Sequence, residues 1–412
     1  MEASKRVLSV ALAWLNRPNL VFLAGACLLC SLPTPSPAAP PEAAAKTVAR
    51  PDPTLSAARR RVLAARPLRL VYYVDDPRAL ESLPARASEI TLLAPQCFWV
   101  DAEGVVHGAI PPAVAELARR LRLPLMPLVI NRGFDRGVAT ALLRNSKAQE
   151  RAITYLAYLA KRDGMLGFQI NLENLDPADK KNFTRFVQRA AARLRRAGRL
   201  LSVAVVPRFS DTDNGRSPSG KYATGEWGAP YDYRALGTAA DFLVLMAYDQ
   251  HGKATAPGPI AGYAWVKEAL EYALRQIPRG KLLLGVPLYG REWTEDGQNI
   301  SSRSLSFQDA KALVTRAGTE VQWDSEWRSP WVRFRNGAGQ HTAWLEDERS
   351  LQEKLRLVRQ RRLRGFAAWR LGFEDEGFWR AVASVFKGGK TDSTSPAAPA
   401  RRRTAKPSKG RH

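Results

Sequence analysis

Eight short apolar runs alternate with stretches of helical periodicity through the middle of the chain. The runs cover residues 68–74, 90–94, 125–130, 166–172, 201–206, 242–247, 282–286 and 365–369. They are rich in leucine and β-branched residues, as strands covered on both faces are. Helical patterns lie between most of them, for example at 111–121, 148–161, 178–195, 263–276 and 349–362. Eight strands joined by helical crossovers predict an α/β protein with a parallel (β/α)8 TIM barrel.

A doubly wound open sheet is the alternative arrangement of the same strands and helices. Nucleotide-binding sheets of that kind carry a glycine-rich phosphate loop after the first strand. Here Asp75, Asp76 and Pro77 follow the first run instead. The barrel is therefore the favoured prediction.

The seventh and eighth runs are separated by nearly eighty residues, which is more than one crossover helix needs. Residues 292–346 contain seven aromatic residues of the Trp and Phe types and a turn signal at Asn336-Gly337. We expect a small α+β insertion between strands 7 and 8. It would lie on the C-terminal face of the barrel and wall a substrate cleft.

The two ends of the chain differ in composition from its middle. Residues 1–39 have the features of a signal peptide or a membrane anchor, because Lys5 and Arg6 precede an apolar run at 20–32. That run is short for a full membrane span, and both alternatives stay open. Residues 40–66 are rich in Pro, Ala and Arg and are expected to be a linker, the barrel should span 67–387, and the basic tail at 388–412 is expected to be disordered.

The net charge predicts attraction to polyanions. The chain has 63 Lys and Arg residues against 39 Asp and Glu residues, a formal charge of +24. Nucleic acid, anionic lipid and acidic cell-wall polymers all fit this charge. The basic tail is either a solvated tail or a tether to an anionic surface of the cell envelope. We expect a secreted or envelope protein and no nucleic-acid partner, since no recognisable nucleic-acid fold accompanies the charge.

Cysteine and histidine usage gives no reason to expect a metal or another cofactor. Two of the three cysteines lie in the N-terminal apolar run, which leaves Cys97 alone in the predicted barrel. A disulfide framework within the barrel is therefore excluded. The four histidines are scattered without helical ligand spacing.

The fourth run ends in a row of polar residues that should point into the barrel. Strand side chains alternate, so Gln169, Asn171 and Glu173 share one side while the apolar residues between them face the helices. The reactive groups of such barrels lie at the C-terminal ends of the strands. A partly desolvated carboxyl has a raised pKa and can donate a proton near neutral pH. We therefore predict that Glu173 is the centre of an active site.

Other strand ends supply candidate partners of Glu173. The sixth run ends at Met246, Tyr248 and Asp249, and Tyr248 can donate a hydrogen bond into the cleft. In the eighth run, Trp369 is a candidate platform for a sugar ring, although a core role is the more common one for a lone tryptophan.

These strand ends resemble glycoside hydrolase family 18, the chitinase-type barrels, and most of all the bacterial branch with the spore-cortex peptidoglycan glucosaminidases. The resemblance covers about residues 68–386. Its motifs are APQCFWVDAEGVVHG at 94–108, GFQINLEN at 167–174, MAYD at 246–249, GVPLYGREW at 285–293 and AAWRLG at 367–372. Each motif is weak alone, and their order makes them specific together.

The resemblance implies hydrolysis of N-acetylglucosamine polymers, peptidoglycan or chitin, by substrate-assisted retaining catalysis. In this mechanism the acetamido oxygen of the sugar attacks the anomeric carbon. Glu173 would protonate the leaving oxygen, with Asn171 and Tyr248 as further catalytic residues. Substrate-binding positions implied by the motifs are Gln169, Met246, Asp249, Tyr289 and Trp369.

One position departs from the family's DxxDxDxE pattern. Asn171 stands where the family has the aspartate two residues before the acid, and Leu166 and Gln169 occupy the two earlier acidic positions. A neutral amide can orient the acetamido group but supplies no negative charge to stabilise it. A glycan-binding barrel with impaired catalysis is therefore the alternative function.

Overall fold

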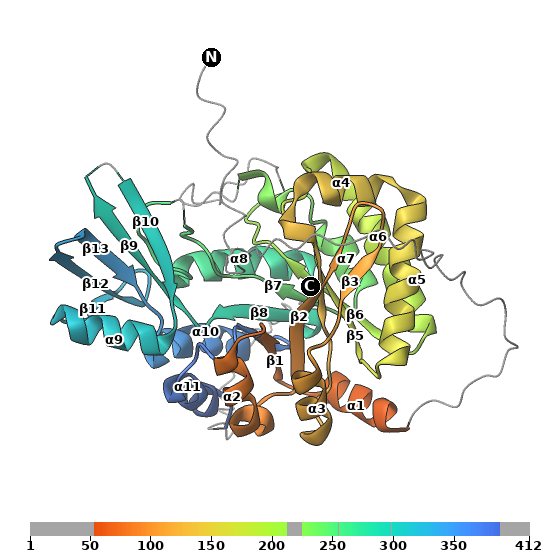
Figure 1. Ribbon diagram of the computed structural model, residues 1–412, viewed down its shortest axis with the longest axis horizontal. Helices are drawn as coiled ribbons and strands as arrows, with labels where there is room; N and C mark the ends of the chain where they lie inside the picture. Colours follow the sequence, from red (N-terminus) through yellow and green to blue (C-terminus); the bar gives the residue numbers. More distant parts are fainter. Residues whose placement is uncertain (1–52, 212–224, 254, 298, 388–412) are drawn as a thin grey trace, which may run out of the picture.

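Eight parallel strands close into a barrel in the computed structural model, which describes residues 53–211, 225–253, 255–297 and 299–387 (Figure 1). The strands are β1 (Leu68–Tyr73), β2 (Leu92–Val100), β4 (Leu128–Asn131), β5 (Gly167–Asn171), β6 (Leu200–Val205), β7 (Phe242–Leu245), β8 (Leu282–Pro287) and β14 (Gly365–Trp369). They pair in the order β1–β14–β8–β7–β6–β5–β4–β2, and β2 pairs again with β1. The predicted (β/α)8 barrel is confirmed.

Helices run back along the outside of the barrel between the strands. They are α2 (Pro77–Arg86), α3 (Pro112–Arg120), α4 (Arg136–Arg144), α5 (Ser146–Arg162), α6 (Lys180–Arg196), α7 (Tyr233–Ala239), α8 (Tyr263–Gln276), α10 (Glu348–Gln360) and α11 (Glu376–Lys387). Polar caps begin several of them: Asp76, Asp135 and Asp232 each accept a backbone N–H of the following first turn. No helix among the described residues is long and apolar enough to cross a membrane.

The core has an inner and an outer layer. Inside the barrel, residues such as Leu70, Leu128 and Leu283 pack on one another, while Phe168 and Ile170 belong to the layer between strands and helices. Strand alternation therefore gives β5 one apolar side and one side that faces the barrel interior.

Helix α1 (Pro53–Ala64) differs from the sequence expectation, because it lies inside the range 40–66 that was expected to be a linker. Its Val62 is fully buried and packs with the inner barrel residues Leu68 and Leu200. Side chains on one face of this segment thus close the N-terminal end of the barrel. The expected signal or anchor segment at 1–39 and the tail at 388–412 lie outside the described residues.

The predicted insertion between β8 and β14 is present. It consists of a five-stranded antiparallel sheet in the order β10–β9–β13–β12–β11 and one helix, α9 (Phe307–Ala317). The strands are β9 (Gly290–Asp296), β10 (Asn299–Leu305), β11 (Gln322–Asp324), β12 (Ser329–Asn336) and β13 (Gly339–Trp344). The β12–β13 hairpin turns directly after Asn336, at Gly337 and Ala338, so the turn signal at Asn336-Gly337 is confirmed. The sheet projects from the barrel on the side away from α4–α6 (Figure 1).

Strand β2 is longer than the apolar run that predicted it. It continues to Val100, because its second half pairs with the short antiparallel strand β3 (Val106–Gly108). Pro95, Gln96 and Cys97 interrupt the apolar pattern before Phe98, so hydrophobicity alone placed the strand end too early.

Candidate active site

Glu173 lies directly beyond the C-terminal end of β5 and is half-buried. Its backbone is held by Asn131 at the end of the neighbouring strand β4: the Glu173 N–H donates to Asn131 Oδ1 over 3.0 Å, and Asn131 Nδ2 donates to the Glu173 carbonyl over 3.1 Å. The pKa of the Glu173 carboxyl is raised to about 7, chiefly by burial. The hydrogen bond from Asn171 lowers this pKa, and the charge of Asp249 raises it further. This carboxyl therefore holds a proton close to neutral pH.

Asn171 connects Glu173 to the barrel interior. Its Nδ2 donates to Glu173 Oε1 over 2.9 Å, which leaves Asn171 Oδ1 buried with no hydrogen-bond partner among the described residues. A buried acceptor without a donor costs free energy, on the order of 1–3 kcal/mol, unless a ligand satisfies it. The position is thus prepared to accept an N–H from a bound molecule.

Gln169 lies one layer deeper than Asn171 and is fully buried. Its Oε1 accepts from the Tyr72 hydroxyl over 2.7 Å, and its Nε2 donates to Ser202 Oγ over 2.6 Å. Since both ends of the amide have partners, Gln169 supports the floor of the site rather than facing a substrate. The sequence had proposed a direct substrate contact at this position.

Asp249 and Tyr289 form a second polar group at the ends of β7 and β8. The Tyr289 hydroxyl donates to Asp249 Oδ1 over 2.6 Å, and the buried Arg291 donates to the same oxygen over 3.2 Å. Asp249 has a left-handed backbone with φ of 57°, which turns the chain sharply at the strand end. The carboxylate is therefore oriented by two donors.

Tyr248 lies between these two groups. Burial raises the pKa of its hydroxyl well above the ordinary value, and Tyr72, Glu173 and Asp249 add to the rise. Its hydroxyl forms no hydrogen bond within the described part of the chain. Gly285 makes room for the Tyr248 ring, because a Cβ at position 285 would lie 2.9 Å from Cε1 of Tyr248. Tyr248 is thus a neutral donor beside Glu173.

Aromatic side chains surround these polar groups. Trp369 at the end of β14 packs against Tyr72, with ring centroids 5.2 Å apart, and joins a cluster with Tyr289 and Trp293. Trp344 from the insertion packs on the same cluster, so the insertion sheet contributes to the site. The remaining predicted residue, Met246, is 9% exposed at the end of β7.

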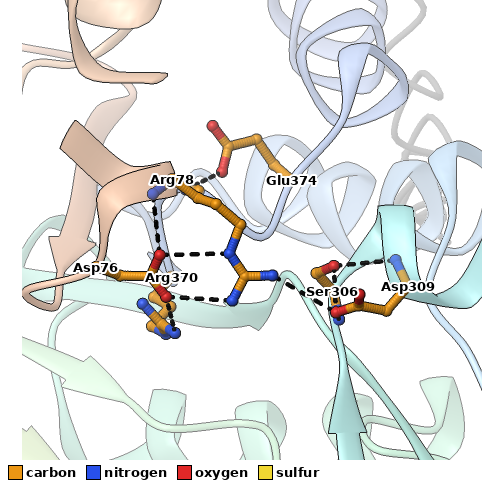
Figure 2. Close-up of polar contacts among 7 residues, drawn as sticks. Asp76, Arg78, Ser306, Asp309, Arg370 and Glu374 are labelled. Carbon is orange, nitrogen blue, oxygen red and sulfur yellow. Dashed lines mark hydrogen bonds and ion pairs between the residues drawn. The ribbon is translucent and has the colours of Figure 1, made fainter. Parts of the chain in front are cut away.

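An ion-pair network joins the insertion to the barrel beside Trp369 (Figure 2). Arg370 is buried and donates to Asp76 Oδ2 over 2.9 Å, and Arg78 contacts both Asp76 and Asp309 of α9. Burial raises the pKa of Asp76, but hydrogen bonds from Arg78 and Arg370 outweigh it and lower the pKa to about 2. Asp76 thus stays charged and joins the β1 and β14 loops, and Arg78 connects it to α9.

Replacing Asp76 with alanine should destabilise the fold, because it leaves the buried Arg370 charge without its carboxylate. We expect a loss of about 3 kcal/mol in the free energy of unfolding, measured by urea denaturation. Glu116→Ala, which breaks the exposed Glu116–Arg119 pair on α3, is the matched control and should change nothing measurable. Equal stability of the Asp76 variant and the control would contradict this role.

Six of the residues predicted from the sequence lie together at one end of the barrel. They are Glu173, Asn171, Tyr248, Asp249, Tyr289 and Trp369. Sequence reasoning missed Tyr72, Asn131 and Arg291. Asn131 is the last residue of a barrel strand, which is the signal that could have found it. Arg291 lies inside the GVPLYGREW motif but was not assigned a contact. Among the described residues, no group of three or more His, Cys, Asp or Glu side chains could hold a metal ion.

A half-buried acid of raised pKa at the C-terminal mouth of a TIM barrel, walled by aromatic rings, defines a glycosidase-type site. Residues 132–374 match the sequence family Glycosyl hydrolases family 18. The chain belongs to this family and is a glycoside hydrolase, as the motifs predicted.

Known proteins agree with this assignment. The chain is 26% identical to the uncharacterized glycosylase YvbX of Bacillus subtilis, over 76% of this chain and 89% of that protein. It is 29% identical to the cortical fragment-lytic enzyme of Bacillus subtilis, over 62% of this chain but only 58% of that protein.

Solved structures show the same barrel. The spore cortex-lytic enzyme SleL of Bacillus megaterium superposes with a TM-score of 0.69 at 28% identity, covering 77% of this chain and 73% of that one. A chitinase from Chromobacterium violaceum superposes with a TM-score of 0.69 at 29% identity, covering 77% and 98%.

Proposed function

We propose that the protein hydrolyses β-1,4 linkages of N-acetylglucosamine-containing polymers, peptidoglycan or chitin, by substrate-assisted retaining catalysis. The observation that carries the proposal is a single carboxyl, Glu173, that is protonated near neutral pH beside two groups able to hold an acetamido substituent, Asn171 and Tyr248. The nearby carboxylate of Asp249 is already bound by Tyr289 and Arg291. Among the described residues of the site, Glu173 is thus the one acid, and no second carboxylate takes the role of nucleophile.

The first step would break the glycosidic bond. The acetamido carbonyl oxygen attacks the anomeric carbon, the anomeric C–O bond breaks, and the leaving oxygen takes the proton of Glu173. Asn171 Oδ1, the buried acceptor without a partner, would accept the acetamido N–H, and the Tyr248 hydroxyl would donate to the carbonyl oxygen. Water then attacks the anomeric carbon and gives a proton to Glu173, while the bond between that carbon and the acetamido oxygen breaks. This step restores the acetamido group and the acid and retains the configuration.

Support for this substrate class comes from the relatives, which include a spore cortex-lytic enzyme and chitinases. The test is release of new reducing ends from chitin oligosaccharides and from purified peptidoglycan, with the anomeric configuration of the product followed by NMR. Glucose oligosaccharides of the same linkage, which lack the acetamido group, should not be cut. Their cleavage, or an inverted product, would contradict substrate assistance.

The activity should fall as the pH rises through about 7, because Glu173 must carry its proton to act as the acid. Its pKa is raised by burial, so the protonated form persists through the mildly acidic range and is lost above the raised pKa. The measurement is kcat/KM for a neutral chitin oligosaccharide between pH 4 and 9. A decline centred near pH 4.5, the ordinary value for a glutamate, would exclude Glu173 in its present environment as the acid.

A catalytically impaired glycan-binding barrel is the second candidate, favoured by Asn171 in place of the family's aspartate.

We further propose export to the cell envelope, on the basis of the basic and apolar features of residues 1–39. Cell fractionation of the tagged full chain tests export, since retention with the cytoplasmic fraction would contradict it.

A further inference from the structure

Basic residues gather at the N-terminal end of the barrel, opposite Glu173. From the last turn of each helix to the strand that follows it, the eight connections at this end contain 19 Lys or Arg residues and three Asp or Glu residues. At the other end, seven connections lead directly from a strand to the next helix. Counted through the first turn of that helix, their described side chains include 9 Lys or Arg residues and 14 Asp or Glu residues. Charge is therefore polarised along the barrel axis.

Two open grooves at this basic end are lined by basic and by no acidic residues, while Glu89 pairs from outside one lining with Arg69 and Lys387, and Glu271 pairs from outside the other with Arg361. One runs between α7, α8 and the end of α10 and has five basic residues in its lining, among them Arg279 and Arg361. The other lies between α1 and the end of α11 and also has five, among them Arg122 and Lys387. We call this end, with its connections and two grooves, the basic face.

Part of the charge has an ordinary explanation, because basic side chains at helix C-termini are favoured by the helix dipole. Two positions go beyond it. Arg122 and Arg362 each lie two residues after a helix end with a left-handed backbone, at φ of 53° and 52°. Glycine is the usual residue there, and other residues are strained by roughly 1 kcal/mol. Neither arginine forms an ion pair within the described part of the chain, so both charges are available to a binding partner.

Both ends of the described chain reach the basic face. Helix α1 crosses the N-terminal end of the barrel, where its Val62 is buried, and Lys387 ends α11 in the groove that Arg61 also lines. Figure 1 shows α1 beside α3 at the lower edge of the view. The sequence before α1 contains the apolar run at 20–32, and the sequence after α11 contains seven Lys or Arg residues and one Asp.

We propose that the basic face docks on an anionic lipid bilayer and holds the glycan cleft on the side away from the membrane. Each Lys or Arg near an anionic bilayer strengthens binding, and a polybasic surface together with an apolar segment gives the two signals that stable attachment needs. The apolar run favours a bilayer over a soluble polyanion, because only a bilayer offers a hydrocarbon layer to it. The proposal concerns location and does not depend on the catalytic mechanism.

The test is co-sedimentation of the full chain with vesicles of phosphatidylglycerol and phosphatidylcholine, or of phosphatidylcholine alone. The triple variant Arg122→Gly/Arg279→Gln/Arg362→Gly removes three charges from the basic face and relieves the strain at two positions, so it should fold as well as the wild type. The control Arg316→Gln/Arg333→Gln/Arg335→Gln removes the same charge from the insertion. Since the apolar run is common to all three proteins, differences between them report the basic face.

The face variant should bind anionic vesicles on the order of 100-fold more weakly than the wild type at low salt, and the control should bind nearly as the wild type. Equal losses in both variants, unchanged binding of the face variant, or equal wild-type binding to the two kinds of vesicle would overturn the proposal. A loss seen with duplex DNA and not with vesicles would assign the face to nucleic acid instead. Far-UV circular dichroism and thermal unfolding of both variants, compared with the wild type, serve as the check on folding.

Discussion

Glutamine in place of Glu173 is expected to lower kcat about 10³-fold or more on every substrate that the enzyme cuts, while glycan affinity stays within a few fold. General acid–base groups contribute on the order of 10²–10⁴ in rate, and this one residue would act in both steps. Glutamine keeps the shape, and its carbonyl oxygen can still accept the Asn171 amide that now donates over 2.9 Å. The measurement pairs reducing-end release with calorimetric binding of a chitin oligosaccharide.

Asp176→Asn is the control for this experiment. Asp176 lies three residues beyond Glu173 on the same loop, where it caps a short helical turn and contacts Arg144. Its variant should retain nearly full activity. Comparable losses in the two variants would mean that the loop, and not the Glu173 proton, limits the rate.

Aspartate in place of Asn171 is expected to raise kcat roughly 10- to 1,000-fold. The acetamido group becomes positively charged as its oxygen bonds to the anomeric carbon, and a carboxylate at this buried position would stabilise that charge. The added negative charge beside Glu173 should also raise the Glu173 pKa further, so that the alkaline limb of the pH profile moves to higher pH. Single-turnover hydrolysis and the pH profile measure the two effects separately.

Asn171→Ala distinguishes orientation from charge. Alanine removes the amide that donates to Glu173, and its side chain cannot accept a hydrogen bond from the substrate. Activity should therefore drop below that of the wild type. If neither the wild type nor the aspartate variant turns over while both bind glycan, the barrel has become a sugar-binding protein. The buried Asn171 Oδ1 would then be an acceptor for a retained ligand rather than for a reacting one.

The charge polarity of the barrel relates the two proposals to each other. The capping aspartates and Glu173 lie at the end that holds the cleft, and the basic connections lie at the end where α1 and α11 meet. An enzyme docked by its basic face would present the cleft to a polymer at a distance from the membrane. Loss of either function in a variant would leave the other measurable, because the sites occupy opposite ends of the strands.

Much of this molecule follows from the sequence alone. Eight apolar runs at crossover spacing predicted the barrel, the long interval before the last run predicted the insertion, and alternation along residues 167–173 predicted which side chains of β5 point inward. These inferences succeed because periodicity and strand alternation depend on neighbours in the chain. The same reasoning ended β2 early and missed helix α1, since a strand interrupted by Pro95 and Gln96 and a helix of low hydrophobicity give weak local signals.

Only the tertiary structure determined which residues meet. Asn131 holds Glu173 from an adjacent strand, Tyr72 holds Gln169 from across the barrel, and Arg291 reaches Asp249 from the insertion. These contacts depend on strand register and on ring closure, which join residues about 40 to 100 positions apart and leave no periodic trace in the sequence. The distribution of charge between the two ends of the barrel has the same origin: the composition showed an excess of basic residues, and the fold placed 19 of the 63 in the connections at one end.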